Sequence, residues 1–159
     1  MTARLRQELD VPADDVVAVL SDPWSYAAWV VGASQVRDVE GDWPKPGAAI
    51  HHSIGAWPLL VRDRTKVVES ELPQGLELDV AVWYFGRGRV RFQVEALGAD
   101  RCAVTMVEEM QEGLMAHLPD AVVDPMLQLR NKETLRRLEA LAHGRRIRGD
   151  GPSGDAGAI

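Results

Sequence analysis

The last long apolar stretch of the chain, residues 114–143, carries its hydrophobic side chains at the spacing of an α-helix. The positions at this spacing form one mainly apolar stripe: Leu127, Asn131, Thr134, Leu135, Leu138, Leu141 and Ala142. Charged residues lie beside this stripe, so the pattern predicts an amphipathic helix that covers a sheet or another helix. Asn131 places a polar amide near the centre of the stripe, where its side chain needs a hydrogen-bond partner.

Upstream of this helix, hydrophobic and polar positions alternate in short segments divided by Gly, Pro and Asp turns. The alternation predicts an antiparallel meander with strands over 36–40, 48–54, 59–71, 76–83, 89–97 and 101–110. A weaker alternation predicts a first strand over 3–9, followed by two short helices over 16–20 and 24–29. Each strand of the meander has one apolar face, which we expect the long helix to cover. The pattern therefore predicts an α+β fold.

Length and composition narrow the class of protein. We expect one domain over residues 1–143 and a disordered, glycine-rich tail over 144–159. A net charge of -6 argues against nucleic-acid binding. Cys102 is the only cysteine, which excludes an intrachain disulfide and a cysteine metal cluster. No apolar run is long enough to span a bilayer or to form the core of a signal peptide, so we expect a cytoplasmic protein.

Glu108 is the first candidate for chemistry. It alternates with Met106 and Met110 on the last predicted strand, so its carboxyl group is expected to point towards the long helix. An inward carboxylate must be neutralised, paired or solvated, and Arg130 on the flank of the helix is a candidate partner. Two interpretations stay open: Glu108 is an acid/base group or ligand anchor, or it turns into solvent at the end of the strand.

Four further residues, one on the helix and three on predicted strands, are candidates for polar groups in the interior. Asn131 either binds a ligand oxygen or fixes the helix by a structural bond to strand backbone. Asp63 is a second inward carboxylate unless a bulge reverses its strand. His51 and His52 are adjacent, so they face opposite ways and make no one-face metal pair. Either His51 or His52 is a general base in the interior, or neither has a catalytic role, and we expect no metal and no cofactor.

Aromatic residues at predicted strand ends and turns suit the mouth of an apolar cavity, with its opening near Trp57, Trp83 and residues 114–119. The residues expected to contact a ligand are Trp57, Asp63, Trp83, Phe92, Val94, Met106, Met110, Leu114, Leu118, Arg130 and Asn131.

Three segments resemble the START-like, or SRPBCC, superfamily: residues 11–23 followed by Tyr26 and Trp29, residues 46–48, and residues 130–138. The last is similar to the helix of bacterial polyketide cyclase/dehydrase-like members. The resemblance covers roughly residues 2–143 and implies a helix-grip fold, in which an antiparallel sheet wraps around a long C-terminal helix. It also implies two short helices after the first strand and a hydrophobic ligand cavity between helix and sheet. It transfers no universal catalytic residue.

The leading functional hypothesis is binding of a small hydrophobic ligand of lipid, polyketide or aromatic type, with or without cyclase/dehydratase-type acid/base chemistry. One alternative is a non-catalytic carrier or sensor. Another is a protein-interaction module of the respiratory-quinone or ribosome-associated type. An enzyme should hold a titrating interior pair, a carrier should lack one, and an interaction module should have a filled cavity and an exposed apolar patch. Whether the protein is an enzyme or a homodimer stays open.

Overall fold

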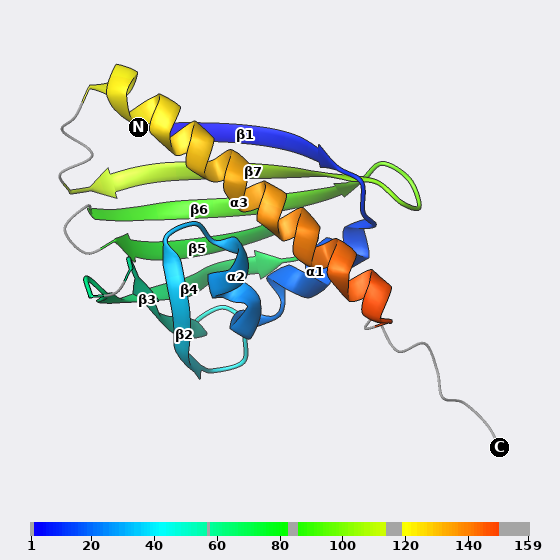
Figure 1. The fold of residues 1–159 in the computed structure, drawn as a ribbon, viewed down its shortest axis with the longest axis horizontal. Helices are drawn as coiled ribbons and strands as arrows, with labels where there is room; N and C mark the ends of the chain where they lie inside the picture. The colour runs from blue at the N-terminus through cyan, green and yellow to red at the C-terminus, as the bar shows by residue number, and fades with distance from the viewer. Residues whose placement is uncertain (1, 57, 83–85, 114–118, 150–159) are drawn as a thin grey trace.

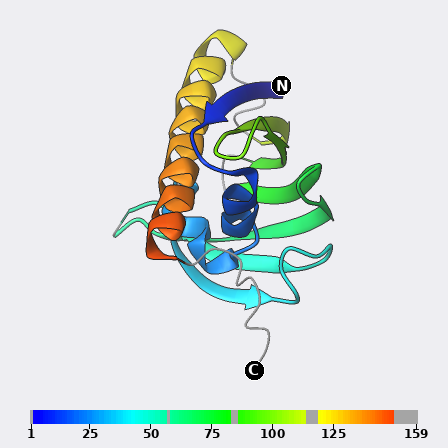
Figure 2. The ribbon, with the colours of Figure 1, turned by 90° about the vertical axis from the view of Figure 1, so that its right-hand side faces the viewer.

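One long helix, α3 (Asp120–Arg148), lies diagonally across one face of a single sheet in the computed structural model (Figure 1). The structure describes residues 2–56, 58–82, 86–113 and 119–149. The elements that precede α3 are β1 (Thr2–Leu9), α1 (Ala13–Leu20), η1 (Pro23–Ser25), α2 (Tyr26–Trp29), β2 (Ala33–Glu40), β3 (Ala49–Ile54), β4 (Val61–Glu71), β5 (Gly75–Val82), β6 (Gly86–Ala96) and β7 (Cys102–Glu112). Seen from the side, α3 covers the sheet as a separate layer (Figure 2).

The seven strands form one antiparallel sheet in the order β1-β7-β6-β5-β4-β3-β2. From β2 to β7 each strand pairs with its neighbour in sequence, which is the predicted meander, whereas β1 pairs with β7 and places Leu5 opposite Met106. The helical segments α1, η1 and α2 follow β1, as the sequence predicted. The α+β fold with a sheet wrapped around a long C-terminal helix is therefore confirmed.

The core lies between α3 and the sheet. Leu135, Leu138 and Ala142 are fully buried on the helix and share one hydrophobic cluster with Phe92 and Val94 of the sheet. Those helix positions belong to the apolar stripe, so burial of the stripe holds α3 against the strands. The helix continues through Gly144 to Arg148 and is capped by Gly149, which has a positive φ of 73°. The observed helix end therefore lies beyond the predicted domain boundary at residue 143.

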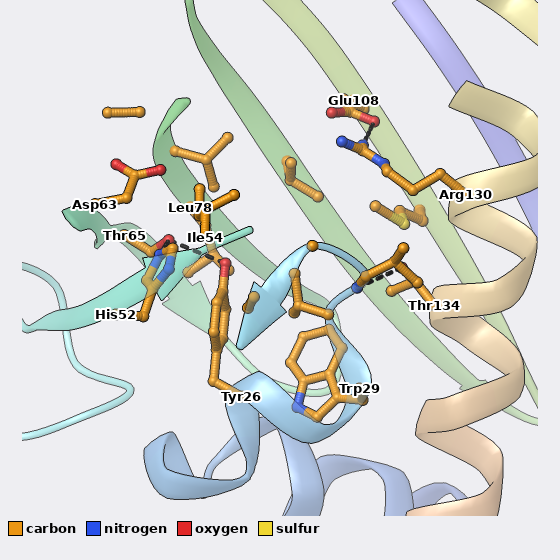
Figure 3. A pocket seen from close by; sticks show the side chains of 18 of the residues that line it. Tyr26, Trp29, His52, Ile54, Asp63, Thr65, Leu78, Glu108, Arg130 and Thr134 are labelled. Atoms are coloured by element: carbon orange, nitrogen blue, oxygen red, sulfur yellow. Dashed lines mark hydrogen bonds and ion pairs between the residues drawn. The ribbon is translucent and has the colours of Figure 1, made fainter. Parts of the chain in front are cut away.

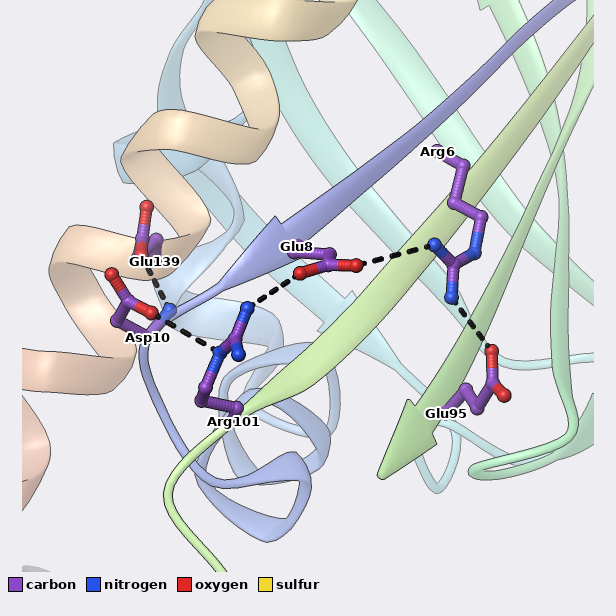
Figure 4. Close-up of polar contacts among 6 residues, drawn as sticks. All are labelled: Arg6, Glu8, Asp10, Glu95, Arg101 and Glu139. Atoms are coloured by element: carbon purple, nitrogen blue, oxygen red, sulfur yellow. Dashed lines mark hydrogen bonds and ion pairs between the residues drawn. The ribbon is translucent and has the colours of Figure 1, made fainter. Parts of the chain in front are cut away.

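Polar contacts on the surface tie the first strand to its neighbours (Figure 4). Arg6 bonds to Glu95 on β6 at 3.1 Å, and Arg101 bonds to Glu8 at 2.5 Å. The backbone N–H of Asp10 donates to Glu139 of α3 at 2.8 Å. Exposed ion pairs contribute only about 0–1 kcal/mol each, so these contacts add to a register that the core already defines.

The sheet opens between β4 and β5 at one end. The β4–β5 pairing extends from Glu71 opposite Gly75 to Thr65 opposite Val80 and stops there in the described part of the chain. Residues 61–64 of β4 continue to pair with β3, while residues 81–82 of β5 continue to pair with β6. We call this divergence the β4–β5 split. Among the described residues, no β4–β5 backbone pairing closes the sheet at this point.

Candidate functional site

A cavity of about 240 Å³ lies between the sheet, α3 and the α2 segment. Its walls are mainly apolar and include Trp29, Val80, Val90, Phe92 and Met106. Polar side chains lie at two ends of this apolar space (Figure 3). Tyr26, His52, Asp63 and Thr65 form one polar end, and Glu108, Arg130 and Thr134 form the other.

Glu108 lies at the cavity wall with its side chain only 3% exposed. Its Oε2 atom accepts hydrogen bonds from Arg130 Nη2 and from Asn131 Nδ2, the latter at 3.0 Å. Arg130 also donates through Nε and Nη2 to Asn131 Oδ1, at 3.2 and 3.0 Å. The three side chains form a closed network between β7 and α3. A carboxylate that accepts from a guanidinium and an amide is better suited to anchoring than to proton transfer.

This network changes the interpretation of Asn131. One of the two sequence hypotheses held that the amide bonds to strand backbone, whereas in the described part of the chain it donates to the side chain of Glu108. Asn131 is 1% exposed and is absent from the described residues that line the cavity. It therefore acts on the site through Glu108 and Arg130, by satisfying a polar group that burial would otherwise leave unpaired.

At the other end, Thr65 connects an aromatic hydroxyl to an imidazole. The hydroxyl of Tyr26 lies 2.9 Å from Thr65 Oγ1, and His52 Nε2 lies 3.0 Å from the same oxygen. Burial lowers the pKa of His52 to about 4, so its ring is neutral at pH 7. Burial also raises the pKa of Tyr26 to about 12, against the lowering effect of the hydrogen bond to Thr65. His52 Nδ1 is buried without a hydrogen-bond partner among the described residues.

Asp63 stands directly opposite His52 in the β3–β4 pairing and lines the cavity. Burial raises the pKa of its carboxyl group to about 6, although the backbone N–H of Arg64 donates to Asp63 Oδ1 at 2.7 Å and acts in the opposite direction. Burial thus favours the neutral form of both groups, by lowering the pKa of His52 and raising that of Asp63. Titratable groups with perturbed pKa values in a cavity are candidates for a functional site.

His51 lies on the outer face of β3 and not in the cavity. Its Nε2 atom is 3.2 Å from Glu40 Oε2. Because successive strand residues point to opposite faces, an inward His52 requires an outward His51. Of the two histidine alternatives, the structure leaves His52 as the interior one.

Besides Asn131, two predicted contact residues do not line the cavity. Val94 is buried in the packed core beside Leu135 and Leu138, and Met110 is half-buried; neither is among the described residues that line the cavity. The helix packs closely where these residues face it, and the open space lies further towards α2, β3 and β4. Trp57, Trp83, Leu114 and Leu118 lie outside the described residues, as does most of the expected opening at residues 114–119.

Several lining residues were not predicted. Tyr26, Trp29 and Thr65 contribute to the site, but the sequence analysis assigned no ligand contact to them. Thr65 could have been predicted from the sequence, because a hydroxyl on the same inward strand face as Asp63 needs a hydrogen-bond partner. The contact of Tyr26 with Thr65 could not, because it joins the α2 segment to β4 and these segments are far apart in the sequence.

The described residues contain no group of three or more His, Cys, Asp or Glu side chains placed to hold a metal ion. Within the same residues, none of the helices combines the length and hydropathy that crossing a bilayer requires.

A sheet wrapped around a helix, with an apolar cavity between them, defines a helix-grip domain. The family model described as "Polyketide cyclase / dehydrase and lipid transport" matches residues 2–143, and the chain belongs to this family. The resemblance seen in the sequence is thereby confirmed. No curated protein matches the chain in sequence.

Solved structures share the fold at low sequence identity. The Zhui aromatase/cyclase from Streptomyces sp. R1128 is 16% identical with a TM-score of 0.69, over 95% of this chain and 98% of that one. A START superfamily protein from Mycobacterium smegmatis is 17% identical with a TM-score of 0.64, over 91% and 95% of the two chains. A conserved protein from Geobacillus kaustophilus is 11% identical with a TM-score of 0.74, over 91% and 97%. These likenesses establish the fold alone.

Proposed function

We propose that this protein binds a small hydrophobic ligand of lipid, polyketide or aromatic type in the cavity between α3 and the sheet. The observation that carries the proposal is the apolar cavity of about 240 Å³ with polar groups at both ends. Ligand sites typically combine apolar walls with a few polar groups that fix orientation. The volume is below the range of about 300–1,000 Å³ common for drug-sized ligands, so the enclosed part of the ligand is small.

Of the two other hypotheses, the interaction module is the less well supported. It predicts a filled cavity, whereas the space between α3 and the sheet is open. A carrier and an enzyme both require the cavity and differ in their interior chemistry.

Binding is tested with 1-aminoanthracene, a neutral dye whose fluorescence rises in apolar surroundings. The wild-type protein is expected to bind it, and Val90→Trp should abolish binding because the indole occupies the cavity that Val90 lines. Val68→Trp adds the same side chain at an exposed position and serves as the control. Equal dye binding by Val90→Trp and wild type, with both folded, would contradict a ligand site here. Native mass spectrometry of the purified protein then identifies any compound retained from the expression host.

A second function, acid/base catalysis of cyclase or dehydratase type, is favoured by one specific observation. His52 and Asp63 face each other across β3 and β4, with pKa values of about 4 and about 6. Near neutral pH, Asp63 is mostly ionised and close to its titration point, so its carboxylate accepts a proton from the substrate and then returns it. His52 is neutral and the weaker base, and its ring orients the substrate by a hydrogen bond.

Nuclear magnetic resonance titration of the imidazole and carboxyl signals tests this second function. We expect His52 to titrate near pH 4 and Asp63 near pH 6. Ordinary values, close to 6.5 for His52 and 3.8 for Asp63, would remove the poised pair and leave a carrier as the better proposal.

A further inference from the structure

A second hollow adjoins the cavity at the β4–β5 split. This hollow has a volume of about 410 Å³, and Asp63 and Ala81 line both spaces. Both residues lie just beyond the last β4–β5 pair, Thr65 opposite Val80. The two spaces therefore lie against each other where the two strands diverge.

Four arginines line the second hollow, which we call the arginine groove: Arg37, Arg62, Arg64 and Arg87. They come from β2, β4 and β6, so the fold gathers charges that are distant in sequence. The chain as a whole carries a net charge of -6, which makes this local concentration of positive charge unexpected from composition. A basic row on a solvated strand would explain Arg62 and Arg64, but not their convergence with Arg37 and Arg87.

Asp63 contributes one carboxyl group to the lining of the groove, but the four arginines outnumber it. Arg62 has no ion pair or side-chain hydrogen bond to any described residue, and Arg64 is 3.9 Å from Glu40 in a loose, exposed pair. Arg37 donates to the backbone oxygen of His52 at 3.1 Å. Among these four, only Arg87 has a close carboxylate in the described chain, Asp79 at 2.9 Å. At least two guanidinium groups are thus available to an anion.

We propose that the arginine groove binds the anionic head group of an amphiphilic ligand, whose apolar part passes through the β4–β5 split into the cavity. The inference rests on the proposed ligand-binding function and specifies its substrate class. Guanidinium groups recognise carboxylate and phosphate through paired N–H donors, so either head group fits the groove. The small apolar cavity holds the tail, and the groove supplies the charge complementarity that the cavity lacks.

The experiment compares two ligands that share a tail and differ in head group. Decanoate and 1-decanol each displace 1-aminoanthracene from wild type, from Arg62→Gln/Arg64→Gln and from Lys66→Gln. Lys66 lies on the same strand and outer face as Arg62 and Arg64, but outside the groove, so its replacement controls for the loss of a positive charge elsewhere on this face. Decyl phosphate replaces decanoate in a parallel arm and shows which head group the groove prefers.

We expect the double variant to bind decanoate about tenfold more weakly than wild type, since two charged contacts are lost. Binding of 1-decanol should be unchanged in all three proteins, and Lys66→Gln should bind decanoate like wild type. Higher ionic strength should weaken decanoate and spare 1-decanol.

Three results would overturn the inference. They are wild-type affinity of the double variant for decanoate, an equal loss in Lys66→Gln, and a parallel loss of 1-decanol affinity in a folded double variant. In each case displacement of the dye by 1-decanol from wild type would still support the proposed function. If wild type binds neither the dye nor 1-decanol, the proposed function itself fails.

Discussion

Replacing Arg130 by Met should destabilise the protein more than replacing Arg130 and Glu108 together. The single variant leaves the Glu108 carboxylate, 3% exposed, with the Asn131 amide as its remaining partner in the network. An unpaired buried charge costs more than the loss of the ion pair itself, because the carboxylate keeps its desolvation penalty without the compensating cation.

The magnitude follows from the exposure of the two partners. Breaking a fully buried ion pair costs about 3–5 kcal/mol. Arg130 is 33% exposed, so cavity water replaces part of its interaction, and we expect a loss of about 2–3 kcal/mol for Arg130→Met. Glu108→Gln keeps an oxygen acceptor for Arg130 and should cost only about 1 kcal/mol. In Glu108→Gln/Arg130→Met no charge remains buried, so the double variant should be more stable than Arg130→Met alone.

Urea denaturation of the four proteins in the cycle measures these differences, provided that the slope of the unfolding free energy against urea stays constant. The expected coupling energy between the two positions is about 1–3 kcal/mol. A double variant whose loss equals the sum of the two single losses would show that Glu108 and Arg130 do not stabilise each other, and the anchoring interpretation would be wrong.

Three other predictions concern stability. Leu138→Ala, at a fully buried position, should lower the free energy of unfolding by about 2–5 kcal/mol. Leu129→Ala on the same helix, where the side chain is 73% exposed, should lower it by less than about 0.5 kcal/mol. Equal losses in denaturant melts would mean that α3 docks by another face. Burial raises the pKa of Asp63 from 3.8 to about 6, so the Asp63 contribution to stability is lost as pH rises through this window; Asp63→Asn should gain about 1–2 kcal/mol over wild type at pH 7, after allowance for partial exposure, and nothing near pH 4, in urea melts at the two pH values. Burial lowers the pKa of His52 from 6.5 to about 4, so the His52 contribution has the opposite sign, is lost as pH falls through this range, and offsets that of Asp63 in wild type. Compared with wild type, His52→Gln should therefore gain stability as pH falls from 7 towards 4, and a stability difference that stays constant across this range would refute the shift.

The alternation of apolar and polar residues predicts which face of the sheet a side chain lies on, but not how closely α3 packs there. It correctly indicated which side of β7 bears Met106, and that side is also where Glu108 lies. It did not indicate where the helix closes on the sheet, which is why Val94 is in the solid core while Phe92, two residues earlier, lines the cavity. Helix position depends on the sum of contacts along α3, a tertiary property that no single strand encodes.

The two histidines show a related limit. Adjacent strand residues face opposite ways, but the choice of His52 for the interior depends on the register of β3 with its neighbours. The β2–β3 pairing contains two register shifts, which residue counting does not reveal. The Asn131 amide illustrates the opposite case: its polarity on an apolar stripe predicted a partner, yet only the structure identified that partner as Glu108.

The pairing of β1 with β7 imposes an order on folding. Of the seven strands β1 is synthesised first, but β7 (Cys102–Glu112), with which β1 pairs, is synthesised last. Contacts between segments so distant in sequence carry a large loop-closure cost and slow the folding of a domain. Arg130 and Thr134, which complete the cavity, arrive later still with α3. During synthesis the apolar face of the growing sheet therefore stays uncovered, and the binding site is completed only when α3 docks.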